Sequence, residues 1–174
     1  MASVGHIAVG LCLGRYLLPA KSPKKTWLGM GIMAALALLP DADVVAFVLR
    51  IPYSAPFGHR GASHSLAIGI VAGLVLGTLL APMFMGRIRT TLAAVLAVTS
   101  HGLLDALTDG GLGVALLWPY ARTRFFAPLR PIPVAPIGLG LLSDRGLSVL
   151  CHETLYFLPL FVLALWPLRK NRVR

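Results

Sequence analysis

The sequence predicts an all-α fold, a polytopic membrane helix bundle of about five transmembrane helices with a long proline-rich loop before the last helix. Of the 174 residues, 57% are hydrophobic and 13% are charged. The mean hydropathy of +0.80 lies outside the range of soluble globular domains. The apolar residues form long runs that end at basic or turn-forming residues. We therefore expect a single integral membrane domain over 1–174, because each crossing takes about 20 residues.

Five apolar segments account for the predicted helices. They cover residues 3–20, 27–49, 64–86, 90–109 and 147–168. Glycine and alanine recur at close intervals in "AIGIVAGLVLG", a pattern that lets membrane helices approach one another. The connection before the last segment cannot be one continuous helix, because it contains several prolines. These are Pro119, Pro128, Pro131, Pro133 and Pro136.

Basic residues at the segment ends indicate how the bundle is oriented. Five crossings place one set on one face: Lys21, Lys24, Lys25, Arg87, Arg89, Arg169, Lys170, Arg172 and Arg174. The opposite face then carries Arg50, Arg60, Arg122, Arg124, Arg130 and Arg145. The larger set favours the first face as cytoplasmic, with the N-terminus outside. Basic residues at segment ends suit a lipid bilayer, so we expect the bilayer as a partner and no nucleic acid.

Most of the six acidic residues and five histidines fall at a similar depth in these segments. His101 is 12 residues after Arg89, and His64 is 23 residues before Arg87. At 1.5 Å per helical residue, these and the intermediate offsets correspond to about 18 to 35 Å. Counting in this way predicts one layer, near the extracytoplasmic face. The layer contains His6, Asp41, Asp43, His64, His101, Asp105 and Glu153.

Such a layer needs compensation for the cost of burying charge. An acidic residue at the centre of a spanning helix costs about 2.5 to 3.5 kcal/mol, so four carboxylates cost on the order of 10 kcal/mol. A divalent metal is a compensation of the right size, since structural zinc binding releases about 10 to 16 kcal/mol. Salt bridges with Arg50 or Arg60 are a competing compensation, but they do not explain the histidines.

Two motifs carry candidate metal ligands. "SHGLLDALTDGG" holds His101 and Asp105 on one helical face, where they can share a metal or simply hydrogen-bond within the bundle. "LLPDADVV" holds Asp41 and Asp43, which diverge on an ideal helix. Pro40 predicts local irregularity that would let both carboxylates converge. A polar helix terminus is the alternative for this second motif.

The stretch "GHRGASHS" predicts a turn that delivers two imidazoles to the layer. Gly58 and Gly61 permit irregular backbone, so His59 and His64 can both turn inward. Arg60 lies between them and can steady an anionic group such as phosphate. Anchoring at the lipid headgroups is the other role open to this arginine.

Four further residues are assessed from their sequence neighbours. His6 alone would be read as an ordinary helix histidine. His152 and Glu153 are adjacent, about 100° apart around a helix, so both cannot readily face one ion. We favour Glu153, because a carboxylate in the membrane has the greater need for a partner. Ser65 is expected to support His64 rather than to act as a nucleophile.

With these residues in hand, the chain resembles the YdjM-like family of bacterial membrane-bound metal-dependent hydrolases. The matching pieces are "GHIAVG", "LLPDAD", "GHRGASHSL", "SHGLLDALTDGG" and "LLWPYARTRFFAPLRPIP", which follow one another along most of the chain. The resemblance implies a multi-pass protein of the bacterial inner membrane. The metal ligands that it implies are His6, Asp41, Asp43, His59, His64, His101, Asp105 and, with less matching sequence around it, Glu153.

The expected function is hydrolysis of an ester or phosphoester in a lipid or lipid-linked substrate by a metal-activated water. Zinc is the first choice of divalent metal, and Mn²⁺ or Fe²⁺ also suit mixed histidine and carboxylate ligands. The expected catalytic residues are Glu153 or Asp43, which would take the proton, and Arg60, which would steady the anion. A divalent metal transporter and a metal-stabilised membrane scaffold are the alternatives.

Overall fold

The computed structural model describes residues 3–18, 22–84 and 86–167 of the chain. Its long helices are α1 (Val4–Leu17), α2 (Pro23–Leu38), α4 (Leu66–Leu80), α5 (Arg87–Asp105) and α6 (Asp144–Leu165). Short helical turns complete the architecture: η1 (Leu39–Val44), α3 (Val45–Val48), η2 (Ala62–His64), η3 (Ala81–Met83) and η4 (Gly138–Leu142). Within the described residues only two isolated β-bridges occur, both in the long loop. The predicted all-α fold is confirmed, and each of the five apolar segments forms a helix.

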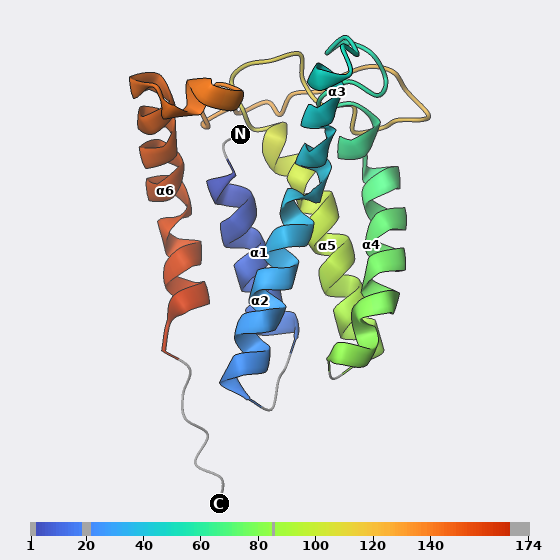
Figure 1. Ribbon diagram of the computed structural model, residues 1–174, viewed down its shortest axis with the longest axis vertical. Coiled ribbons are helices and arrows are strands. Elements are labelled where there is room, and N and C mark those ends of the chain that lie inside the picture. The colour runs from blue at the N-terminus through green and yellow to red at the C-terminus, as the bar shows by residue number, and fades with distance from the viewer. Residues whose placement is uncertain (1–2, 19–21, 85, 168–174) are drawn as a thin grey trace, which may run out of the picture.

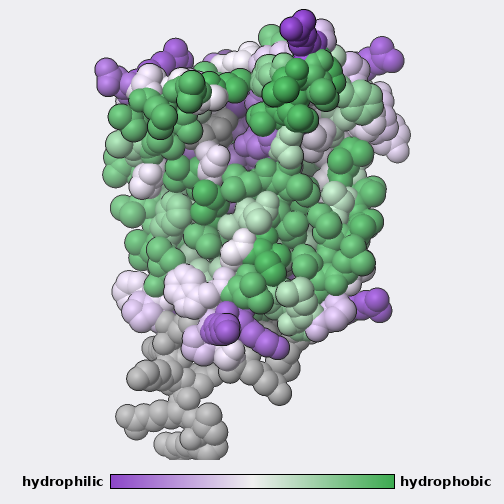
Figure 2. Space-filling view, viewed as in Figure 1, coloured by the Kyte–Doolittle hydropathy of each residue, from purple (hydrophilic) through white to green (hydrophobic). Residues whose placement is uncertain are grey.

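The five long helices run side by side, and successive ones alternate in direction (Figure 1). Three stretches of the described chain are long and apolar enough to cross a membrane: Pro23–Val48, Leu66–Met83 and Asp144–Leu165. α1 is a shorter apolar helix of 14 residues. α5 begins with basic residues and ends on Asp105, and it contacts α1, α2 and α4. Figure 2 shows a broad apolar belt between two polar ends, as expected for a helical membrane protein.

Glycines set the close packing of the helices. A Cβ atom at Gly73 of α4 would lie 2.4 Å from Val95 Cα of α5, and one at Gly10 of α1 would lie 2.4 Å from Ala34 Cα of α2. Either substitution would push two backbones apart. The close approach predicted from the small residues of "AIGIVAGLVLG" is therefore present between α4 and α5.

The segments 49–65 and 106–143 cover one end of the bundle (Figure 1). Backbone hydrogen bonds join them, with Ala115 N–H donating to Arg60 O and Leu66 N–H donating to Leu116 O. The Arg124 guanidinium donates to the carbonyls of Tyr53, Ala55 and His59. The proline-rich loop is thus an ordered cover, and as predicted it is not a continuous helix.

The basic residues divide between the two ends as the predicted topology requires. Lys24, Lys25, Arg87 and Arg89 stand at the starts of α2 and α5, at the end opposite the loop cover (Figure 1). The six arginines of the other predicted face lie in or beside the loop cover. Lys21, Arg169, Lys170, Arg172 and Arg174, which also entered the count, lie outside the described residues.

A candidate metal centre at one end of the bundle

Asp41 and Asp43 are positioned by the change of helix type at the end of α2. Pro40 has no N–H to continue the α-helical hydrogen bonds, and the chain goes on as the 3-10 turn η1. The side chain of Asp41 keeps 27% of its surface exposed, and that of Asp43 keeps 9%. Both carboxylates reach histidines of other elements, so the irregularity predicted from Pro40 does bring them together.

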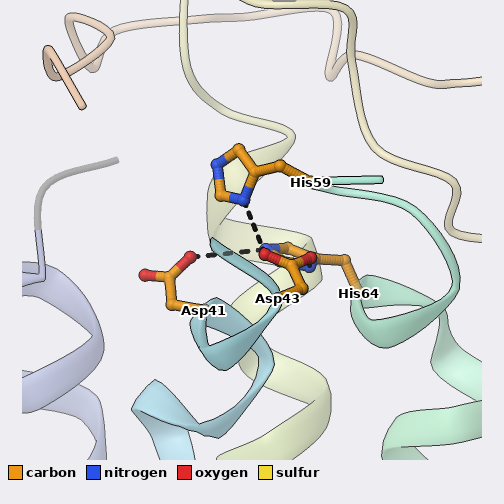
Figure 3. A group of neighbouring side chains, drawn as sticks. All are labelled: Asp41, Asp43, His59 and His64. Carbon is orange, nitrogen blue, oxygen red and sulfur yellow. Dashed lines mark hydrogen bonds and ion pairs between the residues drawn. The ribbon is translucent and has the colours of Figure 1, made fainter. Parts of the chain in front are cut away.

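The "GHRGASHS" turn is compact because two glycines allow it. A Cβ atom at Gly58 would lie 2.2 Å from Pro52 O, and one at Gly61 would lie 2.2 Å from Pro56 O. Arg60 between them has φ of 59°, in the left-handed region. As a result His59 and His64, which are both buried, point toward the same carboxylate, Asp43 (Figure 3).

α5 supplies His101 and Asp105 from consecutive turns of one face, and both side chains are buried. Gly102 between them lets η2 pack directly on this helix. A Cβ atom there would lie 2.2 Å from His64 O. The missing side chain of Gly102 therefore brings His64 beside His101, with ring centroids 4.6 Å apart.

These elements assemble two overlapping groups of possible metal ligands. One group consists of Asp41, His64, His101 and Asp105, and the other of Asp41, Asp43, His59 and His64. In each group the donor atoms lie within 4.8 Å of one another. Nitrogen and oxygen donors in this mixture suit zinc, manganese or iron. The fold therefore holds buried aspartate and histidine side chains within metal-binding distance.

His101 has its ring orientation fixed by the backbone. Its Nδ1 lies 2.7 Å from the carbonyl oxygen of Ala37, an acceptor, so Nδ1 must carry a proton. Nε2 is buried with no hydrogen-bond partner among the described residues, and it faces Asp41 Oδ1 at 3.3 Å. In the neutral ring Nε2 is a lone pair turned toward a carboxylate, an arrangement that a cation between the two atoms would stabilise.

Negative charge is concentrated around His64. Its Nδ1 lies 3.1 Å from Asp43 Oδ2, and its Nε2 lies 3.6 Å from both Asp41 Oδ1 and Asp105 Oδ2. Burial acts to lower the pKa of His64, but the neighbouring carboxylates of Asp105, Asp41 and Asp43 outweigh it and raise that pKa to about 10. The carboxylates thus favour positive charge at the centre of the group.

Arg60 supplies part of that charge. Its Nε lies 2.9 Å from Asp105 Oδ2, and its Nη1 donates to Thr108 Oγ1 and the carbonyl of Gly110. The residue is only 2% exposed. Anchoring at the headgroups is thus excluded for Arg60, which is a buried partner of a candidate ligand.

Asp43 and His59 form a close pair. His59 Nδ1 lies 2.6 Å from Asp43 Oδ1, while Asp43 Oδ2 accepts hydrogen bonds from Arg60 N–H and from the Ser63 hydroxyl. The Ser63 hydroxyl also lies 3.0 Å from His64 Nδ1. The expected support of His64 by Ser65 is wrong, because the Ser65 hydroxyl accepts from Ile68 N–H and caps α4.

The other predicted ligands lie beside or outside the two groups. His6 of α1 stacks on His101 with ring centroids 3.7 Å apart, and its Nε2 lies 3.4 Å from Asp105 Oδ1. His6 belongs to neither group, but it contacts His101 and Asp105 of the first group. Glu153 of α6 is fully buried, whereas His152 is exposed, which is the orientation expected of this pair. Glu153 is nevertheless absent from both groups, so the structure does not place it as a ligand.

A cavity of about 380 Å³ adjoins the candidate centre. Asp41, His59 and Arg60 contribute polar groups to its wall. The remaining lining is mostly apolar and includes residues 134–138 and Leu141 of the proline-rich loop. An anionic group next to an apolar chain would match this lining.

The sequence did not reveal the residues that join the long loop to the "GHRGASHS" turn. Arg124 and Thr108 are examples, since each joins the long loop to the "GHRGASHS" turn or its arginine. Their partners are backbone carbonyls and a buried guanidinium, and no local pattern around either residue points to them. Only the path of the loop over the bundle determines these contacts.

Comparison with known proteins agrees with this architecture. The inner membrane protein YbcI of Escherichia coli (strain K12) is 40% identical to the chain over 161 residues, which cover 88% of both proteins. No solved structure matches. The family model described as YdjM inner membrane protein matches residues 1–172. Because that match spans nearly the whole sequence, with the helical bundle and its polar end, the chain belongs to the YdjM inner membrane protein family.

Proposed function

We propose that this protein is a membrane-embedded, metal-dependent hydrolase acting on an ester or phosphoester. The observation that carries the proposal is the buried His101 Nε2, which faces Asp41 Oδ1 at 3.3 Å while Nδ1 is held by Ala37 O. His64 Nε2 is also buried, and it faces two carboxylates, Asp41 Oδ1 and Asp105 Oδ2, each at 3.6 Å. Donor atoms turned toward one another in this way fit a divalent cation.

Four residues would hold the ion: Asp41, His64, His101 and Asp105. A zinc ion held there would supply Lewis acidity and lower the pKa of a bound water toward neutrality. Ala37 O orients His101, and Arg60 orients Asp105. His6 packs against both ligands of α5. Arg60 also lines the cavity, where its positive charge can steady an anionic ester group.

The cavity supports a lipid or lipid-linked substrate. Its lining combines polar side chains, among them Asp41, His59 and Arg60, with Tyr53 and with apolar residues of η1 and the proline-rich loop. The centre also lies at one end of the apolar belt, where the polar part of a lipid is found (Figure 2). A phosphoester between a polar headgroup and an apolar chain would fit both surroundings.

Metal content and hydrolysis test the proposal together. Protein purified in detergent should hold at least about one equivalent of divalent metal by mass spectrometry, and it should hydrolyse phosphodiesters or phospholipids. Chelation should lower its melting temperature. His101→Ala and Asp105→Ala should lose both metal and activity, while the exposed His152→Ala serves as the matched control. Protein without stoichiometric metal, whose melting does not respond to chelation, would overturn both the hydrolase and a metal transporter.

Assays of hydrolysis and of metal uptake distinguish a hydrolase from a transporter. The candidate ligands lie together at one end of the bundle, whereas an ion pathway needs polar groups at several depths (Figure 1). Metal uptake into proteoliposomes without hydrolysis would favour transport. Metal that stabilises the protein but supports neither uptake nor hydrolysis would favour a scaffold.

The proposed orientation places the centre near the extracytoplasmic face of the bacterial inner membrane. In a variant whose native Cys12 and Cys151 are replaced, Leu139→Cys puts a thiol on the exposed turn η4. A membrane-impermeant thiol reagent added to spheroplasts should label it. Labelling only after lysis would place the centre on the cytoplasmic face.

A further inference from the structure

The carboxylate of Asp43 differs from that of Asp41 because its oxygens already accept short hydrogen bonds. Asp43 accepts from three donors, namely His59 Nδ1–H, Arg60 N–H and the Ser63 hydroxyl, and His64 Nδ1 also lies 3.1 Å from its Oδ2. By contrast, Asp41 faces the ring nitrogens of His64 and His101 at 3.6 and 3.3 Å, beyond ordinary hydrogen-bond length. A metal could bind Asp41 without breaking a short contact. At Asp43 it would have to replace at least one of the three donors.

His59 is therefore held as an oriented imidazole. Its contact with Asp43 Oδ1 at 2.6 Å puts a proton on Nδ1, because an ionised carboxylate can only accept. The other ring nitrogen, Nε2, points away from Asp43 (Figure 3). His59 lines the cavity together with Asp41, the member of the ligand group that is also exposed there. One imidazole thus lies at the boundary between the candidate centre and the space for a substrate.

We infer that His59 is the proton donor to the leaving group of the hydrolysis and that Asp43 is its positioning residue, neither of them being a metal ligand. The inference rests on the proposed function, because it assigns a proton-transfer step to the same site. A carboxylate at Nδ1 fixes the ring and its tautomer, so Nε2 is the ring nitrogen from which a proton can pass to the leaving group.

The step balances as an ordinary hydrolysis. Water oxygen forms a bond to the phosphorus or acyl carbon, and the bond from that atom to the leaving oxygen breaks. His59 Nε2–H gives its proton to the leaving oxygen, so the product departs as an alcohol. The proton released by the attacking water restores His59. No oxidant, reductant or further reactant is needed.

Metal counting gives the first test, and it does not depend on activity. His59→Ala and Asp43→Asn should retain the metal content of the parent protein, while His101→Ala should lose most of it. His152→Ala is the control for removing an imidazole. Retained metal and an unchanged melting temperature would also show that the His59 variant is folded. Loss of metal from His59→Ala would make His59 a ligand and overturn the inference.

Leaving-group dependence gives the second test. Bis(p-nitrophenyl) phosphate and diphenyl phosphate have similar shapes, but p-nitrophenolate leaves without protonation far more readily than phenolate. In His59→Ala, kcat for diphenyl phosphate should fall by about 100-fold or more, whereas kcat for the p-nitrophenyl ester should fall by less than about tenfold. Asp43→Asn should show the same difference with a smaller amplitude. His152→Ala should leave both rates unchanged.

The outcomes separate the inference from the proposed function. An equal loss on both substrates in His59→Ala, with metal retained, would contradict the proton-donor assignment and leave the hydrolase in place. A parent protein that hydrolyses neither these substrates nor phospholipids would overturn the hydrolase and the proton-donor assignment with it. In that case metal counting would still decide whether His59 lies outside the ligand group.

Discussion

The apolar half of the bundle and its polar end are held together by different means. Along α4 and α5 the two backbones approach closely, with Gly69 and Gly73 lying against Thr99 and Val95. At the polar end the contact is charge against charge, as where Arg60 lies 2.9 Å from Asp105. The shape of the first region is set by close packing of small residues. The second region stores charge that only correctly placed partners, or a cation, can offset.

The largest effect on stability should come from removing the buried cation of the polar end. Arg60→Met should lower the free energy of unfolding by about 3 to 5 kcal/mol, because Asp105 would lose a guanidinium 2.9 Å away. Arg50→Met is the matched control, since Arg50 also has a positive φ of 56° but is exposed. Denaturant titration in detergent measures both. Equal stabilities would mean that the ion pair contributes little.

The next effect should be confined to metal binding. His101→Ala removes one of four candidate ligands and should weaken divalent metal binding by about 100-fold or more, measured by competition with a chelating dye. The helical content of the variant should stay that of the parent. Unchanged affinity would show that the ion, if one is bound, is held by other residues.

In the apolar half, the sensitive positions should be the glycines of the helix contacts. Gly73→Ala should destabilise the protein by about 1 to 3 kcal/mol, because the new Cβ would lie 2.4 Å from Val95 Cα. Gly31→Ala on α2 is the control, since a Cβ there meets nothing within 4 Å. Its stability should be unchanged or slightly raised. Similar losses in the two variants would argue against close packing of α4 on α5.

The smallest effect should separate two neighbouring serines. Ser65→Ala removes the cap of α4 and should cost about 1 kcal/mol of stability without changing metal affinity. Ser63→Ala removes the hydroxyl that contacts Asp43 and His64, so it should alter the candidate site more than the fold. Thermal melting and metal titration of both variants test the contrast. A loss of metal affinity in Ser65→Ala, or a loss of stability alone in Ser63→Ala, would contradict these assignments.

Depth in the bundle could be predicted from the sequence, but lateral position could not. Helical rise fixes how far along a segment a residue lies, so counting from the basic ends placed His64, His101 and Asp105 at one level. Glu153 satisfies the same count. However, α6 packs mainly on α1, and Glu153 lies outside both donor groups. A residue count gives one coordinate, and helix packing supplies the other two.

The sequence also could not predict which basic side chain contacts which carboxylate at the polar end. Residue types and the glycines of "GHRGASHS" indicated a turn that delivers two histidines. Which carboxylate each basic side chain contacts depends on the path of the turn. Arg60 contacts Asp105 on α5, while His59 contacts Asp43 on η1. These choices follow from tertiary contacts such as the hydrogen bond from Ala115 N–H to Arg60 O.

The dispersal of the four candidate ligands over η1, η2 and α5 has a consequence for biosynthesis. Asp41 enters the membrane early in translation, and Asp105 follows only when α5 has been made and inserted. The complete donor group therefore cannot exist on the growing chain until most of the bundle has assembled. An ion captured at this end would bind only after insertion, and the nascent helices would pass through the bilayer without the completed centre.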